Sequence, residues 1–136
     1  MEASKARQFI TANHRAVLAT QRADGRPQLS PVSCTVDADG YVIVSTRETA
    51  VKTKNLRRNP LASLCVFGDG FFGQWVQVEG PAEVISLPAA MDGLVDYYRR
   101  ISGEHPDWDD YRAAMVRDRR VIVRIAIERA GPDVSG

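Results

Sequence analysis

Short segments of alternating apolar and polar residues, separated by glycine turns, constrain this chain more than any other feature of its sequence. Residues 16–20, 28–36, 41–46, 61–67, 72–85 and 119–127 show this alternation or are rich in β-branched residues, which is typical of strands. Asp24-Gly25 and Asp39-Gly40 separate the first three segments, and such pairs favour tight hairpins. Tight turns join antiparallel neighbours, so the pattern favours an antiparallel barrel or sandwich over a doubly wound parallel fold.

Gly80-Pro81 interrupts the longest of these segments. Proline donates no hydrogen bond to a strand ladder, so the pair predicts a bulge or bend that lets a sheet curl. Pro31 likewise predicts an edge, a bulge or a bend in the second segment. We therefore expect a mainly β fold with peripheral helices, built on a six-stranded antiparallel barrel.

Four segments carry helical patterns, at residues 4–13, 49–59, 88–102 and 107–117. Thr49 is the expected cap of the second helix, Pro88 opens the third, and Asp107 caps the fourth. The 136 residues predict one domain, 1–136, in which residues 131–136 form a disordered tail.

Composition narrows the class of protein. The chain has 18 basic against 17 acidic residues, a balance that argues against a nucleic-acid partner. Cys34 and Cys65 stand in no metal-binding motif, which predicts reduced thiols and no bound metal. No apolar run approaches the ~18 residues of a membrane span, and the first residues resemble no signal peptide. We expect a cytoplasmic protein with no membrane partner.

Residues 47–58 concentrate positive charge, with five basic side chains against Glu48 alone. On a helical wheel Lys52 shares the core-directed arc with Leu56, in the first turn of the predicted helix. This arrangement predicts an anion site for a phosphate or a polycarboxylate. The alternative is a solvated basic face with a snorkelling Lys52. A second arc groups Lys54, Arg57 and Arg58.

Small polar residues flank this basic segment. They can bond the carbonyl groups and ring nitrogens of a flat heterocycle, although half-exposed strands carry such residues without any ligand. They are Gln28, Ser30, Ser33, Ser45 and Thr46. His14 and His105 accompany no nucleophile motif, so we expect no catalytic side chain of the triad kind.

Several segments together resemble the pyridoxamine 5′-phosphate oxidase-like superfamily of flavin- or deazaflavin-binding split β-barrels. Within it the chain is similar to the small actinobacterial proteins that depend on coenzyme F420. The resemblance covers residues 7 to 128, through segments 17–20, 24–30, 52–60, 78–80, 98–112 and 119–121.

The resemblance implies a homodimer with two cofactor sites at the subunit interface. The ring of the cofactor would lie against Gln28, Ser30, Pro31, Val32, Ser45 and Thr46. Its phosphate would meet Lys52, together with Ala50 and Val51, and Trp75 would approach from the other subunit.

The implied activity is hydride transfer from reduced coenzyme F420 to a small conjugated organic substrate. The cofactor carries this chemistry, so no catalytic side chain is required. Lys54, Arg57 and Arg58 would attract the anionic oligoglutamate tail. Two alternatives stay open: an FMN-binding oxidoreductase or flavin reductase on the same barrel, and a non-catalytic protein that carries a cofactor or a tetrapyrrole.

Overall fold

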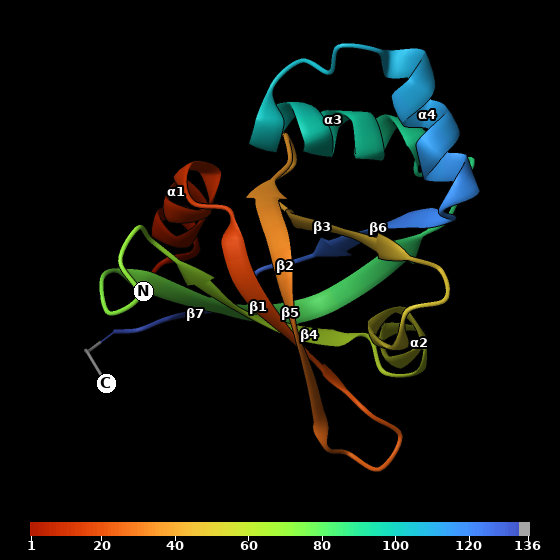
Figure 1. The fold of residues 1–136 in the computed structure, drawn as a ribbon. Helices are drawn as coiled ribbons and strands as arrows, with labels where there is room; N and C mark the ends of the chain where they lie inside the picture. Colours follow the sequence, from red (N-terminus) through yellow and green to blue (C-terminus); the bar gives the residue numbers. More distant parts are fainter. Residues whose placement is uncertain (134–136) are drawn as a thin grey trace.

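A closed antiparallel barrel forms the centre of the protein in a computed structural model that describes residues 1–133 (Figure 1). Around the barrel the strands follow the order β4 (Leu61–Phe67), β1 (Arg15–Gln21), β2 (Pro27–Val36), β3 (Val42–Arg47), β6 (Arg120–Ile125) and β5 (Trp75–Ile85). Pairing of β4 with β5 closes the ring. The predicted fold of six antiparallel strands with peripheral helices is therefore confirmed.

A seventh strand, β7 (Arg129–Gly131), was not expected from the sequence. The last strand predicted, at residues 119–127, is observed as β6 and ends at Ile125. The chain then returns along β5, where Gly131 pairs with Gln77. The expectation of a disordered tail is therefore wrong at Gly131, because the edge of β5 supplies the hydrogen bonds for this short segment. Asp133 also forms an ion pair with the Met1 amino group. Residues 134–136 lie outside the described part of the chain.

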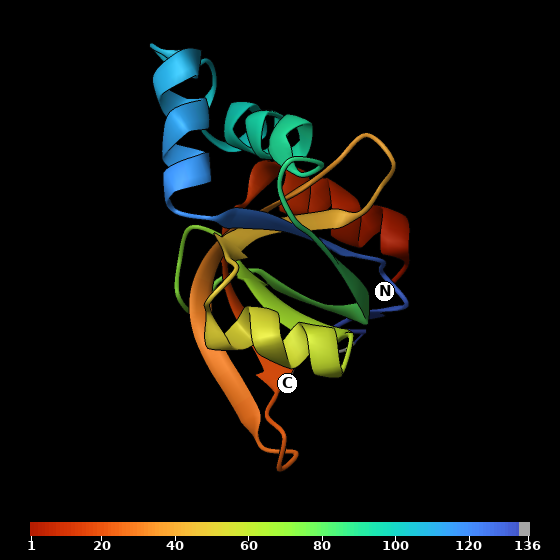
Figure 2. The same ribbon diagram turned by 90° about the vertical axis from the view of Figure 1, so that its right-hand side faces the viewer.

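In the described part of the chain, four helices surround the barrel: α1 (Ala3–Ala12), α2 (Val51–Arg58), α3 (Met91–Ser102) and α4 (Trp108–Arg117). In both ribbon views α3 and α4 lie together on one side of the barrel, away from α2 (Figures 1 and 2). Among the described residues, no helix is both long enough and apolar enough to cross a bilayer.

Two of the expected helix starts are wrong. The residue at the N-cap of α2 is Ala50, not Thr49, because the Ala50 N–H closes a turn onto the Arg47 carbonyl before the helix begins. Helix α3 begins at Met91, since Pro88 instead accepts the Met91 N–H in a preceding turn. The expected cap of α4 is confirmed, because the Asp107 carboxylate accepts the Asp110 N–H at 3.1 Å.

Alternate residues of the strands build two cores. Inward-facing side chains such as Leu18, Val44, Leu64, Val78 and Val123 fill the barrel. A second cluster lies where α3 and α4 cover the outer face of β3 and β6, and contains Ile43, Leu94, Val95, Tyr111 and Ile122. Burial of these side chains supplies the main drive for folding.

Gly80 marks the corner of the barrel. β5 pairs with β4 as far as Pro81 and with β6 from Ala82 onward. A Cβ atom on Gly80 would lie 1.8 Å from the Ala126 carbonyl oxygen, so only glycine permits this close backbone approach. The bend expected at Gly80-Pro81 is therefore confirmed as the point where one strand changes partner.

The barrel is split between β2 and β3. Their pairing begins at Cys34, opposite Val44, whereas residues 27–33 pair with β1 alone. The Cys34 N–H bonds to the His14 carbonyl, so the backbone groups of Cys34 point toward β1. Backbone groups of successive residues in a strand point to opposite sides, so those of Leu29, Pro31 and Ser33 point away from β1, to the free side. We call this free side of residues 27–33 the split edge. Pro31 lies on it, which confirms the edge position among the alternatives for that proline.

Candidate functional site

Helix α2 packs beside the split edge through polar contacts. The Lys52 ammonium donates to Ser30 Oγ at 3.3 Å. Farther along the helix, Asn55 Nδ2 donates to Thr20 Oγ1 at a distance of 3.1 Å. The Thr20 hydroxyl in turn donates to Gln28 Oε1, also at 3.1 Å. This partly buried chain of hydrogen bonds fixes α2 relative to β1 and β2.

Lys52 and Arg120 form a pair of like charges at this position. The pKa of Lys52 lies below its ordinary value of 10.5, first because burial disfavours the ammonium and second because Arg120 repels it. Within residues 1–133, neither side chain forms an ion pair with a carboxylate. Two cations without an acidic partner favour the binding of an anion.

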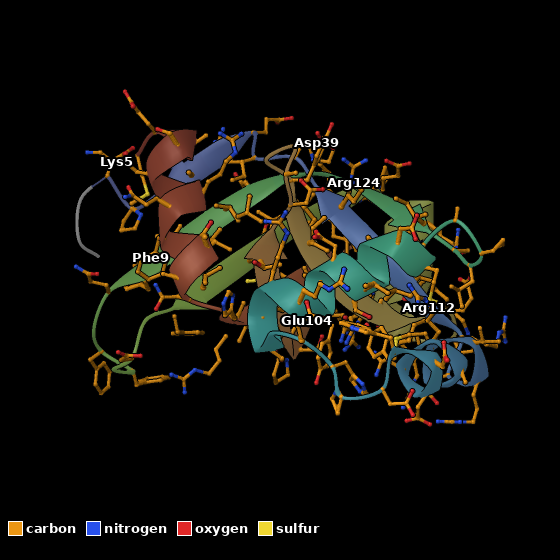
Figure 3. The ribbon with its side chains drawn as sticks, turned by 90° about the horizontal axis from the view of Figure 1, so that it is seen from above. Lys5, Phe9, Asp39, Glu104, Arg112 and Arg124 are labelled. Atoms are coloured by element: carbon orange, nitrogen blue, oxygen red, sulfur yellow. The ribbon has the colours of Figure 1, made fainter. Side chains whose placement is uncertain are left out.

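Sequence reasoning did not single out Arg120. It opens β6 and lies opposite Arg47 of β3, so the sheet pairing alone brings it to α2. Arg124, on the same face of β6, provides a contrast. Its guanidinium lies 3.4 Å from both Asp37 and Asp39 and stacks 4.0 Å from the Tyr41 ring (Figure 3). Arg124 is thus neutralised locally, whereas Arg120 is not.

The predicted ring-binding residues divide between two faces of the sheet. Gln28, Ser30 and Val32 share the inward face, because they pair with the inward-facing residues of β1. Pro31 is exposed on the outer face. Thr46 is 3% exposed and points into the barrel, so its side chain is separated from the partly exposed Ser45 next to it.

Ala50 and Val51 directly precede Lys52, at the start of α2. Val51 is 57% exposed, and the first backbone N–H groups of a helix have no partner within that helix. These N–H groups, the Ser30 hydroxyl, Lys52 and Arg120 make a donor set that suits a phosphate group.

The three residues predicted to hold an anionic tail differ in their contacts. Arg57 donates to the Glu48 carboxylate at 2.6 Å and to Ser86 Oγ at 2.8 Å. Arg58 donates to the Gln21 carbonyl at 2.7 Å and to Asn55 Oδ1 at 3.0 Å. Lys54 is exposed and, among the described residues, makes no side-chain hydrogen bond or ion pair.

Glu48 anchors the loop that leads into α2. Ser86 and Arg57 both donate to its carboxylate, and these bonds hold the pKa of Glu48 below its ordinary value of 4.5. The Glu48 N–H also bonds to the carbonyl of Arg119 at 2.9 Å. Arg119 has φ 52°, a left-handed conformation that ends α4. The loop is therefore fixed from two sides.

Within one chain the structure does not bring Trp75 to Lys52. Trp75 pairs with Phe67 at one end of the β4–β5 ladder, whereas Leu61 and Pro81 pair at the other end, next to α2. Trp75 instead lines a pocket of about 390 Å³ with Lys5 and Phe9 of α1. Figure 3 labels these two residues of α1.

Tyr97 of α3 is a second residue that sequence reasoning did not single out. Its hydroxyl donates to the Ser33 carbonyl at 2.9 Å, at the last position of the split edge. Burial raises the pKa of Tyr97 to about 12, so the phenol keeps its proton at neutral pH. The sequence carried no signal for this contact, because the two residues are 64 positions apart.

The histidines lie in other surroundings. His14 Nδ1 lies 2.8 Å from the Cys34 carbonyl, and His105 packs among Tyr98, Trp108 and Tyr111. In the described part of the chain, no three His, Cys, Asp or Glu side chains gather closely enough to hold a metal ion.

Comparison with known proteins agrees with this architecture. The F420H2-dependent biliverdin reductase of Mycobacterium tuberculosis (strain CDC 1551 / Oshkosh) is 32% identical over 123 residues, which cover 89% of this chain and 80% of that protein. The crystal structure of a conserved hypothetical protein from Mycobacterium tuberculosis has a TM-score of 0.77 and 28% identity, and the match covers 100% of this chain and 92% of the other.

A solved F420 reductase has a TM-score of 0.67 over 88% of this chain and 90% of its own; at 20% identity this match concerns the fold alone. The family model described as pyridoxamine 5′-phosphate oxidase matches residues 3–131. This match spans nearly the whole sequence and the complete barrel. The chain belongs to the pyridoxamine 5′-phosphate oxidase family.

Proposed function

We propose that this protein is an oxidoreductase that uses coenzyme F420 to reduce a small conjugated organic substrate. The observation that carries the proposal is the Lys52–Arg120 pair, which provides two cations without an acidic partner beside the split edge. The relative that shares 32% identity is an F420H2-dependent reductase, which favours F420 over other anionic cofactors.

In this proposal Lys52 and Arg120 hold the cofactor phosphate, assisted by the Ser30 hydroxyl and the backbone at Ala50 and Val51. The deazaflavin, when bound, supplies the hydride chemistry. The free backbone groups of the split edge, with Ser45 across from them, bind and orient the ring. The side chains of Gln28 and Thr46 act indirectly, since one is bonded within the barrel wall and the other is buried.

Lys54 is the residue best placed to attract the anionic tail, because Arg57 and Arg58 already have partners in the protein. Exposed ion pairs contribute only about 0.2–1 kcal/mol each. We therefore expect the tail to modulate affinity, while the phosphate contacts set most of it.

The proposed substrate class is an extended conjugated molecule. Hydride addition needs an electrophilic carbon in conjugation with an electron-accepting atom, and the tetrapyrrole biliverdin, substrate of the related reductase, meets that need. Biliverdin is therefore the first acceptor to assay. Cytoplasmic location remains a prediction from composition.

We further propose that the protein is a homodimer joined through the outer wall of β1, β2, β4 and β5. Leu29 and Leu61 are 61% and 54% exposed near the α2 end of this wall, and Phe71 and Phe72 are 75% and 96% exposed in the loop at its other end. A twofold axis perpendicular to the wall would place the α2 end of one copy against the opposite end of the other copy. The aromatic loop and Trp75 of one copy would then reach the α2 end of its partner.

Cofactor identity can be tested by titrating the purified protein with F420 and with FMN and following the fluorescence of each. Saturable binding of F420 and oxidation of its reduced form by biliverdin would support the proposal. Tighter binding of FMN with flavin-dependent turnover would replace it with the FMN alternative. Binding of biliverdin or heme without hydride transfer to any acceptor would indicate a carrier protein.

Light scattering tests the assembly. The wild type should have twice the monomer mass at micromolar concentration, and the double variant Leu29→Lys/Leu61→Lys should have the monomer mass, because charge opposes burial of the wall. Wild-type protein at the monomer mass would refute the dimer and, with it, the contribution of Trp75 to a second subunit's site.

A further inference from the structure

Tyr97 places a phenol hydroxyl at the end of the split edge. Its bond to the Ser33 carbonyl is 2.9 Å long and lies at the protein surface. Ser33 is the last residue of β2 before pairing with β3 begins, and its carbonyl faces the free side. The hydroxyl therefore occupies the place where the next hydrogen bond of the ladder would be.

The same hydroxyl lies near the proposed anion site. Arg120 is a cause of the pKa shifts of both Tyr97 and Lys52, so this guanidinium lies within electrostatic range of the two groups. Ser30 and Ser33 are three residues apart, which corresponds to about 10 Å along a strand. A cofactor that extends from the Lys52–Arg120 pair along the split edge would therefore bring the substrate held against its ring toward Tyr97 at the far end.

We propose that Tyr97 is the residue that donates a proton to the substrate during reduction, an inference that rests on the proposed function. The substrate receives a hydride from the reduced deazaflavin at its electrophilic carbon. Its conjugated electron pair moves to the oxygen or nitrogen at the other end, and that atom takes the proton from Tyr97 Oη. The resulting phenolate lies near Arg120 and recovers a proton from water.

A cation faces Tyr97 and opposes the rise in its pKa that burial causes. The titratable or charged groups that face it are Cys34 of β2, Arg120 of β6 and Tyr111 of α4. Burial raises the pKa of the Cys34 thiol to about 12, so of the three only the arginine carries charge at neutral pH. A cation next to a developing phenolate lowers the barrier to proton transfer.

Other hydroxyl groups nearby are less suitable. Tyr111 donates to the Leu94 carbonyl in a buried position. The Ser30 hydroxyl accepts from Lys52 and lies at the phosphate end of the edge. Among these candidates, Tyr97 alone places a phenol on the split edge, in a half-buried position whose hydrogen bond is reached by solvent.

The test compares Tyr97→Phe with Tyr98→Phe, a matched loss of one phenol hydroxyl on the neighbouring residue, which packs against His105, Trp108 and Tyr111. Reduced F420 is mixed with biliverdin, and with a nitroalkene whose nitronate product is stable without immediate protonation. We expect Tyr97→Phe to slow biliverdin reduction about 100-fold, within the range for general acids. Reduction of the nitroalkene, and all activity of Tyr98→Phe, should stay within about twofold of wild type.

A second readout needs no turnover. Affinity for oxidised F420, measured by fluorescence, should be the same in Tyr97→Phe and wild type, because the proposed contact is to substrate. Equal slowing of both acceptors, or a matching loss of F420 affinity, would show that Tyr97 only shapes the site and would overturn the proposal. Wild-type protein that binds F420 but reduces neither acceptor would instead refute the proposed function itself.

Discussion

Replacing Lys52 by methionine should change stability and cofactor affinity in opposite directions. The ammonium is disfavoured in the folded protein by burial and by Arg120. Its removal therefore removes an unfavourable electrostatic free energy that is present in the folded protein and absent from the unfolded chain. Methionine keeps the aliphatic packing of the lysine stem. Like-charge repulsion at a partly exposed site is worth up to about 1 kcal/mol after solvent screening. The lost hydrogen bond to Ser30 is long, at 3.3 Å, and costs about 0.5 kcal/mol.

We therefore expect the free energy of unfolding of the ligand-free Lys52→Met protein to rise by about 0.5 kcal/mol. Binding should respond in the other direction, because a charge-assisted contact to phosphate contributes about 1.5–3 kcal/mol. This corresponds to a tenfold to hundredfold weaker affinity for F420, at roughly 1.4 kcal/mol for each factor of ten.

Urea denaturation of the free protein and a fluorescence titration with F420 measure the two effects separately. Lys54→Met is the matched control, since Lys54 is exposed and has no partner among residues 1–133. Its stability should stay within about 0.5 kcal/mol of wild type. An affinity of Lys52→Met equal to that of the wild type would refute the anion site, and a stability loss of several kcal/mol would refute the account of like-charge repulsion.

Two further predictions concern the framework of the site. Gly80→Ala forces a Cβ to within 1.8 Å of the Ala126 carbonyl oxygen, so thermal denaturation should show a loss of about 3 kcal/mol. Gly93→Ala meets only the Ile122 side chain at 3.3 Å and gains helix propensity, so it should stay within about 1 kcal/mol; equal effects of the two would contradict the close-approach argument. Because the folded pKa of Glu48 is lowered, its contribution to stability is present above the ordinary value of 4.5 and disappears as pH falls through the lower folded value. The stability difference between wild type and Glu48→Gln, measured by urea denaturation, should therefore shrink between neutral and acidic pH, and a constant difference would contradict it.

Local signals in the sequence were sufficient for most of the framework. Asp24-Gly25 and Asp39-Gly40 define their hairpin turns, and both glycines have positive φ as such turns require. Gly80-Pro81 marked the corner because only the smallest residue permits the approach of Ala126. Lys52 was recognisable because it is a charged residue on the core-directed arc of the predicted helix, where apolar residues are the rule.

The remaining parts of the site depend on contacts between distant residues. Arg120 and Tyr97 reach α2 and β2 through strand pairing and through the packing of α3, neither of which leaves a local pattern. Strand β7 is too short to show alternation, and it forms because β5 offers an unpaired edge. Thr49 was a good capping residue by type, but the turn closed by Ala50 moved the start of the helix.

The place of β6 in the chain has a consequence for synthesis. β3 and β5 are both complete by Ile85, yet the strand that joins them, β6, begins only at Arg120. Until those residues leave the ribosome, both neighbours present open hydrogen-bonding edges, and such edges invite aggregation. We expect nascent chains that end before Arg120 to remain sensitive to protease, and chains extended by a carboxy-terminal linker to become resistant once Ile125 has emerged. For this fold β6 is the last of the barrel strands to be made, and it is the strand that completes the barrel.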